Sequence, residues 1–222
     1  MTERTEILIG KENVEKLAQK HIAVFGLGGV GGYVAEMLTR AGVGELTIID
    51  FDVVSVSNLN RQIIALNSTV GCLKTDAMAS RLKDINPNIK LHIICEKYTP
   101  ENHDEFFKNH YDYVVDAIDM VTSKIDLITY CHNHNIKIVS AMGAGNRYEI
   151  PYFTVDDVYN TFNDGLAKVL RKKLRENGIE SHDVVFTKEP AKPNGRTVGS
   201  ISYYPAMCGC ALSGFVINEL IK

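Results

Sequence analysis

The sequence predicts an α/β fold in which helices flank a mostly parallel β-sheet. Short apolar runs alternate with segments whose apolar residues recur at helical spacing. This alternation is typical of βαβ units, in which a helix connects two parallel strands. A glycine-rich turn follows the first apolar run, and 222 residues are enough to form one large domain.

Short apolar runs bounded by glycine or polar residues predict five strands, of which the first two are expected to be buried. These runs cover residues 21–25, 46–50, 90–95, 113–116 and 137–140. Helical spacing predicts further helices along this part of the chain, and glycine or proline ends the clearer ones. Their ranges are 11–20, 31–40, 68–85, 100–109 and 123–133, with Gly42 or Gly44 and then Asn86-Pro87 as end signals.

The chain changes character after residue 145. Residues 164–177 have the apolar spacing of a helix, whereas two prolines and a glycine within 188–196 indicate a surface loop. Residues 206–221 are almost wholly apolar, which favours a buried terminal helix, because a membrane span needs about 20 apolar residues. We expect a single domain with a core at 1–150, a basic helix and loop insertion at 151–200, and a terminal strand or helix at 201–222 that returns to the core.

The composition argues against several classes of protein. Lys and Arg total 24 against 27 Asp and Glu, a formal net charge of −3, so any nucleic acid would be held by a local patch. Five cysteines without a Cys-x-x-Cys pair argue against a disulfide framework and a structural zinc site. The polar segment 1–20 has no signal-peptide pattern. We expect a cytoplasmic protein with neither a membrane nor DNA as a partner.

The glycine-rich turn is the strongest local motif. Gly26, Gly28, Gly29 and Gly31 lie between a predicted strand and a predicted helix. Without side chains the backbone can approach a phosphate, which the N–H groups of the helix N-terminus then face. Asp50 ends the next strand about twenty residues later, where a Rossmann-like fold places its ribose-binding carboxylate. We interpret residues 1–150 as a nucleotide-binding core, although such glycines could also serve only tight helix–strand packing.

A polar segment after Asp50 distinguishes ATP from NAD. A dehydrogenase needs no further charges here, because its glycine loop already accommodates the pyrophosphate of NAD. An enzyme that attacks the α-phosphate of ATP must stabilise charge on the pyrophosphate leaving group, and arginine, lysine and carboxylate-bound Mg²⁺ are suited to this. Arg61 or Lys74, taken alone, could equally be a solvated surface charge. The candidate residues are Asp52, Ser57, Asn58, Arg61, Gln62 and Lys74, with Asp119 at the end of a later strand.

From Arg4 to about Lys97 these residues resemble the superfamily of ubiquitin-activating enzymes and their bacterial relatives. The resemblance implies a single adenylation domain, residues 1–222, that activates a carboxylate with ATP and Mg²⁺, usually as a homodimer. It implies catalytic roles for Arg61, Lys74 and Asp119. Gly29 and Asn58 would contact phosphate, Asp50 the ribose, Asp119 the Mg²⁺ or the α-phosphate region, and Arg4 would be the arginine that a partner subunit supplies.

The second half resembles one branch of this superfamily, the tRNA threonylcarbamoyladenosine dehydratases. The resemblance implies that a carboxylate of the modified nucleoside in tRNA is adenylated. A nucleophile in the same side chain then attacks, releasing AMP with net loss of water. Because an internal nucleophile has a high effective concentration, no catalytic cysteine is expected. The matching segments are 116–124, 143–147, 156–161, 164–171, 184–190 and 199–202, and Gly165 departs from the branch, which usually has proline there.

The helix predicted at 164–177 holds the most concentrated positive charge of the chain. The branch resemblance implies that its basic residues contact tRNA phosphates. Charge alone favours the solvated face of an amphipathic helix instead. The residues are Lys168, Arg171, Lys172, Lys173 and Arg175.

Three other functions remain open from the sequence. An adenylyltransferase for the C-terminus of a ubiquitin-like sulfur-carrier protein would use the same nucleotide site without RNA. A non-catalytic nucleotide-binding scaffold would bind ATP without turnover. A dehydrogenase, the most distant alternative, would bind NAD in the glycine loop.

Overall fold

The computed structural model describes residues 1–150, 152–192 and 197–222. Within them the strands are β1 (His21–Phe25), β2 (Glu45–Ile49), β3 (Lys90–Ile94), β4 (Tyr113–Asp116), β5 (Ile138–Ala141), β6 (Phe153–Asp157) and β7 (Asp183–Thr187). They form one seven-stranded sheet with the order β3-β2-β1-β4-β5-β7-β6. All neighbouring pairs are parallel except β7 and the edge strand β6. The predicted mostly parallel α/β fold is confirmed.

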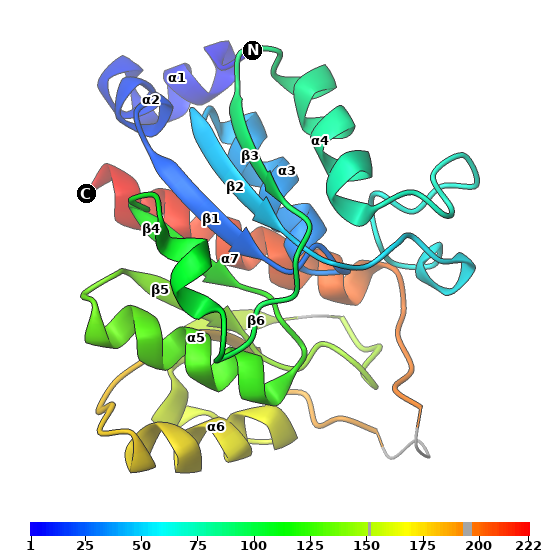
Figure 1. Cartoon of the computed structure of the whole chain (residues 1–222), viewed down its shortest axis with the longest axis vertical. Coiled ribbons are helices and arrows are strands. Elements are labelled where there is room, and N and C mark those ends of the chain that lie inside the picture. The colour runs from blue at the N-terminus through cyan, green and yellow to red at the C-terminus, as the bar shows by residue number, and fades with distance from the viewer. Residues whose placement is uncertain (151, 193–196) are drawn as a thin grey trace.

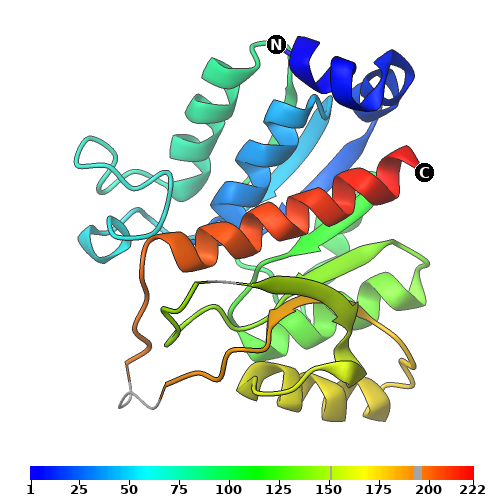
Figure 2. The same cartoon turned by 180° about the vertical axis from the view of Figure 1, so that it is seen from behind.

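Helices cover both faces of this sheet. They are α1 (Glu3–Ile9), α2 (Lys11–Ala18), α3 (Gly31–Ala41), α4 (Lys74–Ile85), α5 (Val121–Asn133), α6 (Gly165–Glu176) and α7 (Tyr203–Ile221), with the short 3-10 helices η1 (Val56–Asn58), η2 (His103–Phe107) and η3 (Val158–Asn160). One face carries α3, α4 and α7, and the other carries η2, α5 and α6 (Figures 1 and 2). Each face has its own apolar core, so Val24 and Phe25, which point to opposite faces, are both fully buried.

Helix α7 is the one helix among the described residues whose length and hydropathy would suit a membrane span. In the structure it packs against α3 and against β5 and β6 (Figure 2). Gly209 permits the close contact with the start of α3, since a Cβ there would lie 2.6 Å from the Val30 carbonyl oxygen. Tyr204 and Leu212 are fully buried, which confirms the predicted buried terminal helix.

Several predicted segments differ from the structure. The helix expected at 68–85 begins only at Lys74, because the preceding residues form turns that bring Leu73 beside Val53. The helix expected at 100–109 is reduced to η2. The described C-terminal segment has no strand, since residues 203–221 form a single helix.

Residues 151–200 hold more than the expected basic helix and loop. Strand β7 lies between β5 and β6, and β6 pairs with it in the antiparallel direction. Neither strand was predicted. The two pair with each other across the whole of α6, and such a long-range pairing leaves no local pattern. Of the loop predicted at 188–196, residues 193–196 lie outside the described residues.

Candidate active site

A crevice opens where the strand order reverses, between β1 and β4. Residues 26–30 and 117–120 follow these two strands and flank the crevice. Ligands of open α/β sheets bind at such positions, outside the carboxyl ends of the strands. The crevice holds a cavity of about 710 Å³, which is in the range of small-molecule sites.

The loop after β1 has glycine where a side chain could not fit. Gly26 has a φ of +90°, and a Cβ there would lie 2.8 Å from the Ala117 carbonyl oxygen. A Cβ on Gly31 would overlap the Gly26 carbonyl oxygen at 1.8 Å. Gly31 therefore closes the loop onto α3, whereas Gly26, Gly28 and Gly29 line the cavity. Because α3 begins directly after the loop, its dipole favours an anion in the cavity.

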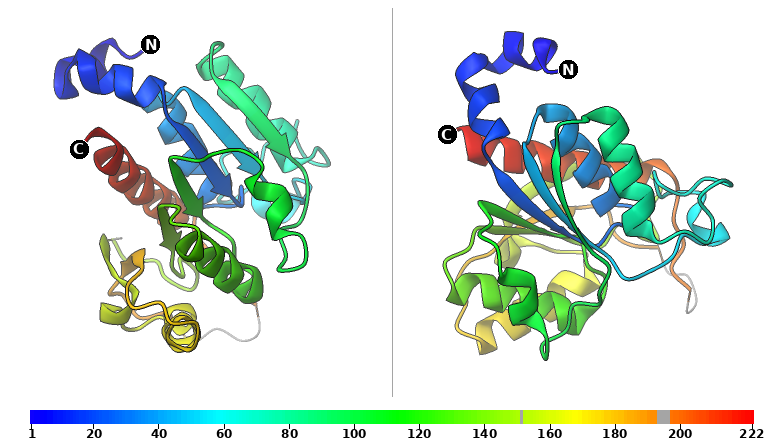
Figure 3. Two further views of the ribbon diagram at one scale, coloured as in Figure 1. Left: turned by 60° about the vertical axis from the view of Figure 1, so that its left-hand side comes forward. Right: turned by 45° about the horizontal axis from the view of Figure 1, so that its top comes forward.

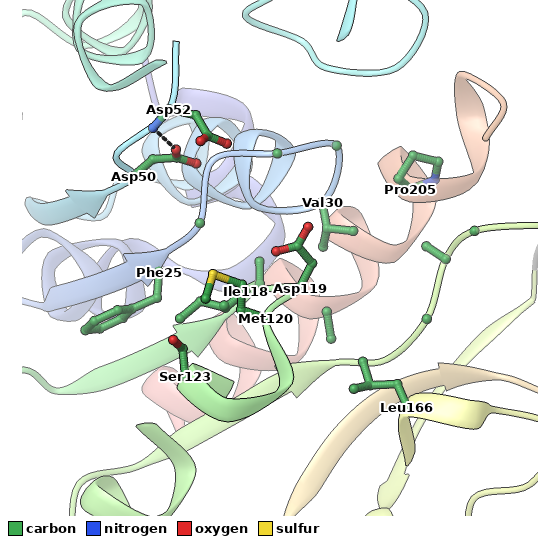
Figure 4. A pocket seen from close by; sticks show the side chains of 18 of the residues that line it. Phe25, Val30, Asp50, Asp52, Ile118, Asp119, Met120, Ser123, Leu166 and Pro205 are labelled. Carbon is green, nitrogen blue, oxygen red and sulfur yellow. Dashed lines mark hydrogen bonds between the residues drawn. The ribbon is translucent and has the colours of Figure 1, made fainter. Parts of the chain in front are cut away.

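Asp50, which follows β2 directly, holds the loop in place. Its Oδ2 accepts a hydrogen bond from the Leu27 N–H at 2.7 Å, and its Oδ1 accepts one from the Asp52 N–H at 2.8 Å (Figure 4). Each carboxylate oxygen has a further lone pair. Asp50 lines the cavity, so it can fix the loop and still accept a hydrogen bond from a ribose hydroxyl.

Lys74, the first residue of α4, lies against two carboxylates. Its Nζ donates to Asp52 Oδ2 at 2.7 Å and lies 3.8 Å from Asp50 Oδ1. The Lys74 side chain is nearly buried, so its charge acts where water screens it poorly. Gln62 also lines the cavity, and its buried Oε1 has no hydrogen-bond partner among the described residues. A ligand with a donor group would satisfy this oxygen.

Arg61 reaches the cavity from the turn that contains η1. Its Nη1 donates to the Ser57 carbonyl oxygen at 2.8 Å and to Asn60 Oδ1 at 3.0 Å. Asn58 stabilises the same turn, since its Oδ1 accepts the Ser55 N–H at 3.0 Å. Arg61 is among the residues that line the cavity, whereas Ser57 and Asn58 are not. Both residues belong to the turn that carries Arg61, and their contacts with a ligand stay a prediction.

Asp119 lies in the loop after β4, and its carboxylate projects into the cavity (Figure 4). Within the described residues no hydrogen bond or ion pair engages this carboxylate. Asp116 anchors the loop, because its Oδ1 accepts the Ile118 N–H at 3.0 Å and its Oδ2 accepts a hydrogen bond from the fully buried Lys124 at 2.6 Å. An unpaired carboxylate in a cavity fits Mg²⁺, which prefers oxygen ligands.

The opposite wall comes from the second half of the chain. It consists of residues 142–145 and the first turns of α6, including Leu166 and Val169 (Figure 4). Arg147, which is 4% exposed, donates to four backbone carbonyl oxygens at 2.6–3.3 Å and lies 3.4 Å from the Asp164 carboxylate. Asp164 accepts the N–H groups of both the loop and the first turn of α6. The pair therefore ties the loop to the helix.

The ThiF family matches residues 3–222. This chain belongs to the ThiF family. It is 37% identical to the tRNA threonylcarbamoyladenosine dehydratase of Bacillus subtilis, over 99% of this chain and 94% of that protein. The protein of the same name from Haemophilus influenzae is 40% identical, over 81% of this chain and 72% of its own length. The crystal structure of the E. coli tRNA N6-threonylcarbamoyladenosine dehydratase in complex with ATP matches with a TM-score of 0.93 at 34% identity, covering 98% of this chain and 92% of that one. The resemblance found in the sequence is confirmed.

The basic residues of α6 make different contacts in this ThiF-family chain. Four of the five interact with neighbouring side chains on the protein surface. Lys168 is exposed and has no ion pair within the described residues. Four of the basic side chains of α6 therefore already make contacts within the protein. Lys168 is the one of the five whose charge is most available to an external ligand. The four contacts join Arg171 to Thr161 at 2.5 Å, Lys172 and Lys173 to Glu176 at 3.9 and 2.7 Å, and Arg175 to the Tyr159 ring at 4.6 Å.

Arg4 lies away from the ThiF-family cavity of its own chain. It belongs to α1, a helix that the sequence analysis did not predict. This helix packs on α2 at the periphery of the molecule (Figure 3). Thr2, just before α1, lies beside Gly42 at the end of α3 that is remote from the crevice. Arg4 is exposed and does not line the cavity.

The cavity also includes residues that the sequence analysis did not single out. Lys97 and Tyr98 follow β3, so the position of ligands at the carboxyl ends of parallel strands could have indicated them. Pro205, in the first turn of α7, lies against Gly29, where an added Cβ would be 3.1 Å from its ring (Figure 4). No local pattern indicates Pro205, because its position depends on how α7 packs across α3.

Proposed function

We propose that this chain is a cytoplasmic, ATP-dependent tRNA threonylcarbamoyladenosine dehydratase with one adenylation domain, residues 1–222. The observation that carries the proposal is one cavity with two unlike walls. The glycine loop, Arg61 and Lys74 suit a nucleoside triphosphate, whereas the loop 142–145 and the start of α6 suit an acyl substrate. Strands from both halves of the chain share one sheet, which supports a single domain.

In the first step a carboxylate oxygen of the modified nucleoside attacks the α-phosphorus of ATP. The new P–O bond forms as the bond to the bridging oxygen breaks, and pyrophosphate leaves with that electron pair. Backbone N–H groups of residues 26–29 bind phosphate, and Arg61 and Lys74 stabilise the charge on the leaving group. Asp50 accepts a hydrogen bond from the ribose. Asp119 would hold Mg²⁺, which neutralises phosphate charge when it is bound.

In the second step a nucleophile in the threonylcarbamoyl side chain attacks the acyl carbon. The bond to the AMP oxygen breaks, AMP leaves, and the nucleophile loses its proton, so the nucleoside loses one water overall. No cysteine is among the described residues that line the cavity. Burial raises the pKa of the Cys208 thiol to about 12, which makes it a poor nucleophile. The internal attack needs no enzymic thiol.

The nucleoside enters this cavity as part of tRNA, and α6 provides the adjoining surface. The first turn of α6 forms part of the cavity wall, since Gly165 and Leu166 line the cavity. Lys168 lies within its first turn and is exposed. We infer that Lys168 and the basic residues after it contact tRNA phosphates, without discriminating sequence.

We infer further that the chain acts as a homodimer in which Arg4 of one copy completes the cavity of the other. Helix α1 exposes Ile7 at 73% and Leu8 at 83%, and α7 exposes Met207 at 47%. A second copy would cover these apolar side chains. Because α1 lies away from the crevice of its own chain, Arg4 could reach a cavity only in a second copy (Figure 3).

The decisive experiment is mass spectrometry of nucleosides from tRNA that carries threonylcarbamoyladenosine. The tRNA is incubated with the protein, ATP and Mg²⁺, and the modified nucleoside is expected to lose the mass of one water. The loss should require ATP and should disappear with Arg61→Ala. An unchanged nucleoside, with ATP still bound to folded protein, would contradict the tRNA substrate. Pyrophosphate exchange stimulated by a protein that ends in Gly-Gly would then favour a sulfur-carrier adenylyltransferase.

A further inference from the structure

Three side chains able to bind a metal converge at the amino-terminal end of the sheet, opposite the crevice. They are His21 at the start of β1, Glu45 at the start of β2, and His92 in β3. The strand register pairs His21 with Glu45, and Glu45 with Lys90, two residues before His92. All therefore project from one face of three adjacent strands. Their possible ligand atoms lie within 4.8 Å of one another.

The distances are close to those of a coordination sphere. His21 Nδ1 lies 3.4 Å from Glu45 Oε1, and His92 Nε2 lies 2.6 Å from the same oxygen. Zn²⁺ forms bonds of about 2.0–2.2 Å to imidazole and carboxylate, so tetrahedral ligand atoms lie about 3.3 Å apart. The His21, Glu45 and His92 side chains are 11%, 25% and 31% exposed. Small rotations of these side chains would bring all three ligand atoms to bonding distance.

The two ring nitrogens of His21 have different neighbours. Nε2 lies 2.8 Å from the Thr47 hydroxyl, and this hydrogen bond fixes the orientation of the ring. Nδ1 lies 3.4 Å from Glu45 Oε1. One nitrogen is therefore held by the protein, and the other is directed at the Glu45 carboxylate.

Lys90 shares the Glu45 carboxylate with the two histidines. The Lys90 ammonium lies 2.9 Å from Glu45 Oε1, and its 64% exposure lets it move into solvent when a metal binds.

We propose that His21, Glu45 and His92 form a binding site for a divalent transition-metal cation, with Zn²⁺ the best match. Two imidazole nitrogens and one carboxylate are a ligand set that suits Zn²⁺, with water in the fourth position. Thr47 orients His21 through the ring nitrogen that does not face the metal. The cation joins three neighbouring strands and lies at the opposite end of the sheet from the crevice. It therefore stabilises the fold and takes no part in adenylation.

The test is titration of the EDTA-treated full-length chain with ZnCl₂, by calorimetry and by thermal unfolding. The wild-type chain is expected to bind one Zn²⁺ at this site and to unfold at a higher temperature when ZnCl₂ is present. His92→Ala and Glu45→Gln should each weaken this binding by more than about tenfold, a loss that even an outer-sphere partner can cause. His103→Ala is the matched control, because His103 is also 31% exposed and lies 3.0 Å from a carboxylate, that of Asp126. It should retain the binding.

The comparison between variants decides the outcome, because the exposed Cys72, Cys95 and Cys210 can also bind Zn²⁺ and are present in every variant. Equal affinity and an equal thermal shift in the wild-type chain and in both His92→Ala and Glu45→Gln would overturn the proposal. Loss of binding in His103→Ala to the same extent as in His92→Ala would overturn it too. The ATP-dependent activity of His92→Ala, measured with Mg²⁺ and without added ZnCl₂, should match that of the wild-type chain.

Discussion

The two walls of the crevice use polar groups in different ways. The first wall contains the glycine loop and the predicted ATP-binding residues, and the second contains residues 142–145 and the start of α6. On the first wall, the Asp119 carboxylate and the Oε1 of Gln62 have no partner among the described residues. On the second wall, Arg147 donates to four backbone carbonyls, and Asp164 caps α6. A charged residue near a pocket is thus available to a ligand only where the fold leaves its hydrogen-bonding groups unfilled. The polar groups of the first wall are free to bind a ligand, whereas those of the second wall hold the loop 142–145 and α6 in position.

The largest effect is expected on the second wall. Arg147→Met keeps an apolar stem but removes the hydrogen bonds and leaves Asp164 buried without its cation. We expect a loss of about 3–5 kcal/mol in the free energy of unfolding, measured by urea denaturation. Lys11→Met, on an exposed lysine that pairs with the exposed Glu15 in α2, is the control and should cost less than about 1 kcal/mol. If Arg147→Met has normal stability and has lost only substrate binding, Arg147 binds the ligand. The contrast between the two walls would then be wrong.

The next effect concerns the first wall and should appear in catalysis alone. Asp119→Asn removes a carboxylate that contacts no other described group, so the free energy of unfolding should stay unchanged. Adenylation, followed as pyrophosphate release, should fall about 10²–10³-fold, as when one charge-stabilising group is removed from an active site. Asp84→Asn, at an exposed position of α4 outside the cavity, is the matched control. Near-normal turnover in Asp119→Asn would remove this residue from the site.

The stability of the protein should depend on pH because of His182, a buried histidine in the second half of the chain. His182 is buried beside Ser140, and burial, with the positive charges of His132 and Lys124, lowers its pKa to about 3. Between pH 6.5 and about 3 the unfolded chain binds a proton at His182 that the folded chain does not bind. Stability should therefore fall with pH in this window, by up to about 1.4 kcal/mol per pH unit.

The measurement is the free energy of unfolding of His182→Gln and of wild type between pH 7 and pH 4. The variant keeps a group able to hydrogen-bond Ser140 but cannot titrate, so the stability difference between the two chains should shrink as the pH falls. His134→Gln, at an exposed position, should follow the wild-type curve. Parallel curves for wild type and His182→Gln would show that His182 does not stay neutral in the folded chain.

The smallest effect is expected on the outer surface of α6. Lys168→Ala should lower the slope of log tRNA affinity against log salt by about 1, since one phosphate contact is lost, while ATP affinity stays unchanged. Lys172→Ala should change the slope less, because Lys172 is shared with Glu176. Lys11→Ala, on α2 and remote from the crevice, is the control. Identical slopes for Lys168→Ala and wild type would show that Lys168 does not contact a tRNA phosphate.

Local patterns were sufficient for the first half of the fold. The five predicted strands lie within one residue of β1 to β5. Four of them are buried on both faces and therefore appear as continuous apolar runs, whereas the edge strand β3 is partly exposed. Gly42 ends α3 as predicted, with a φ of +99° that favours glycine. Residues 68–73 were predicted wrongly as helix, because the turns that replace it depend on the pairing of Val53 with Leu73.

By itself the sequence determined the α/β class, the glycine loop and the set of charged residues from which the candidate site is drawn, because these depend on local spacing and side-chain chemistry. Only the tertiary structure decided which of those charges face the cavity. It also decided that α6 begins at the wall of the cavity and that β6 and β7 extend the sheet. His21, Glu45 and His92 likewise meet only through the order and register of three strands, since contacts between residues far apart in the chain leave no local pattern.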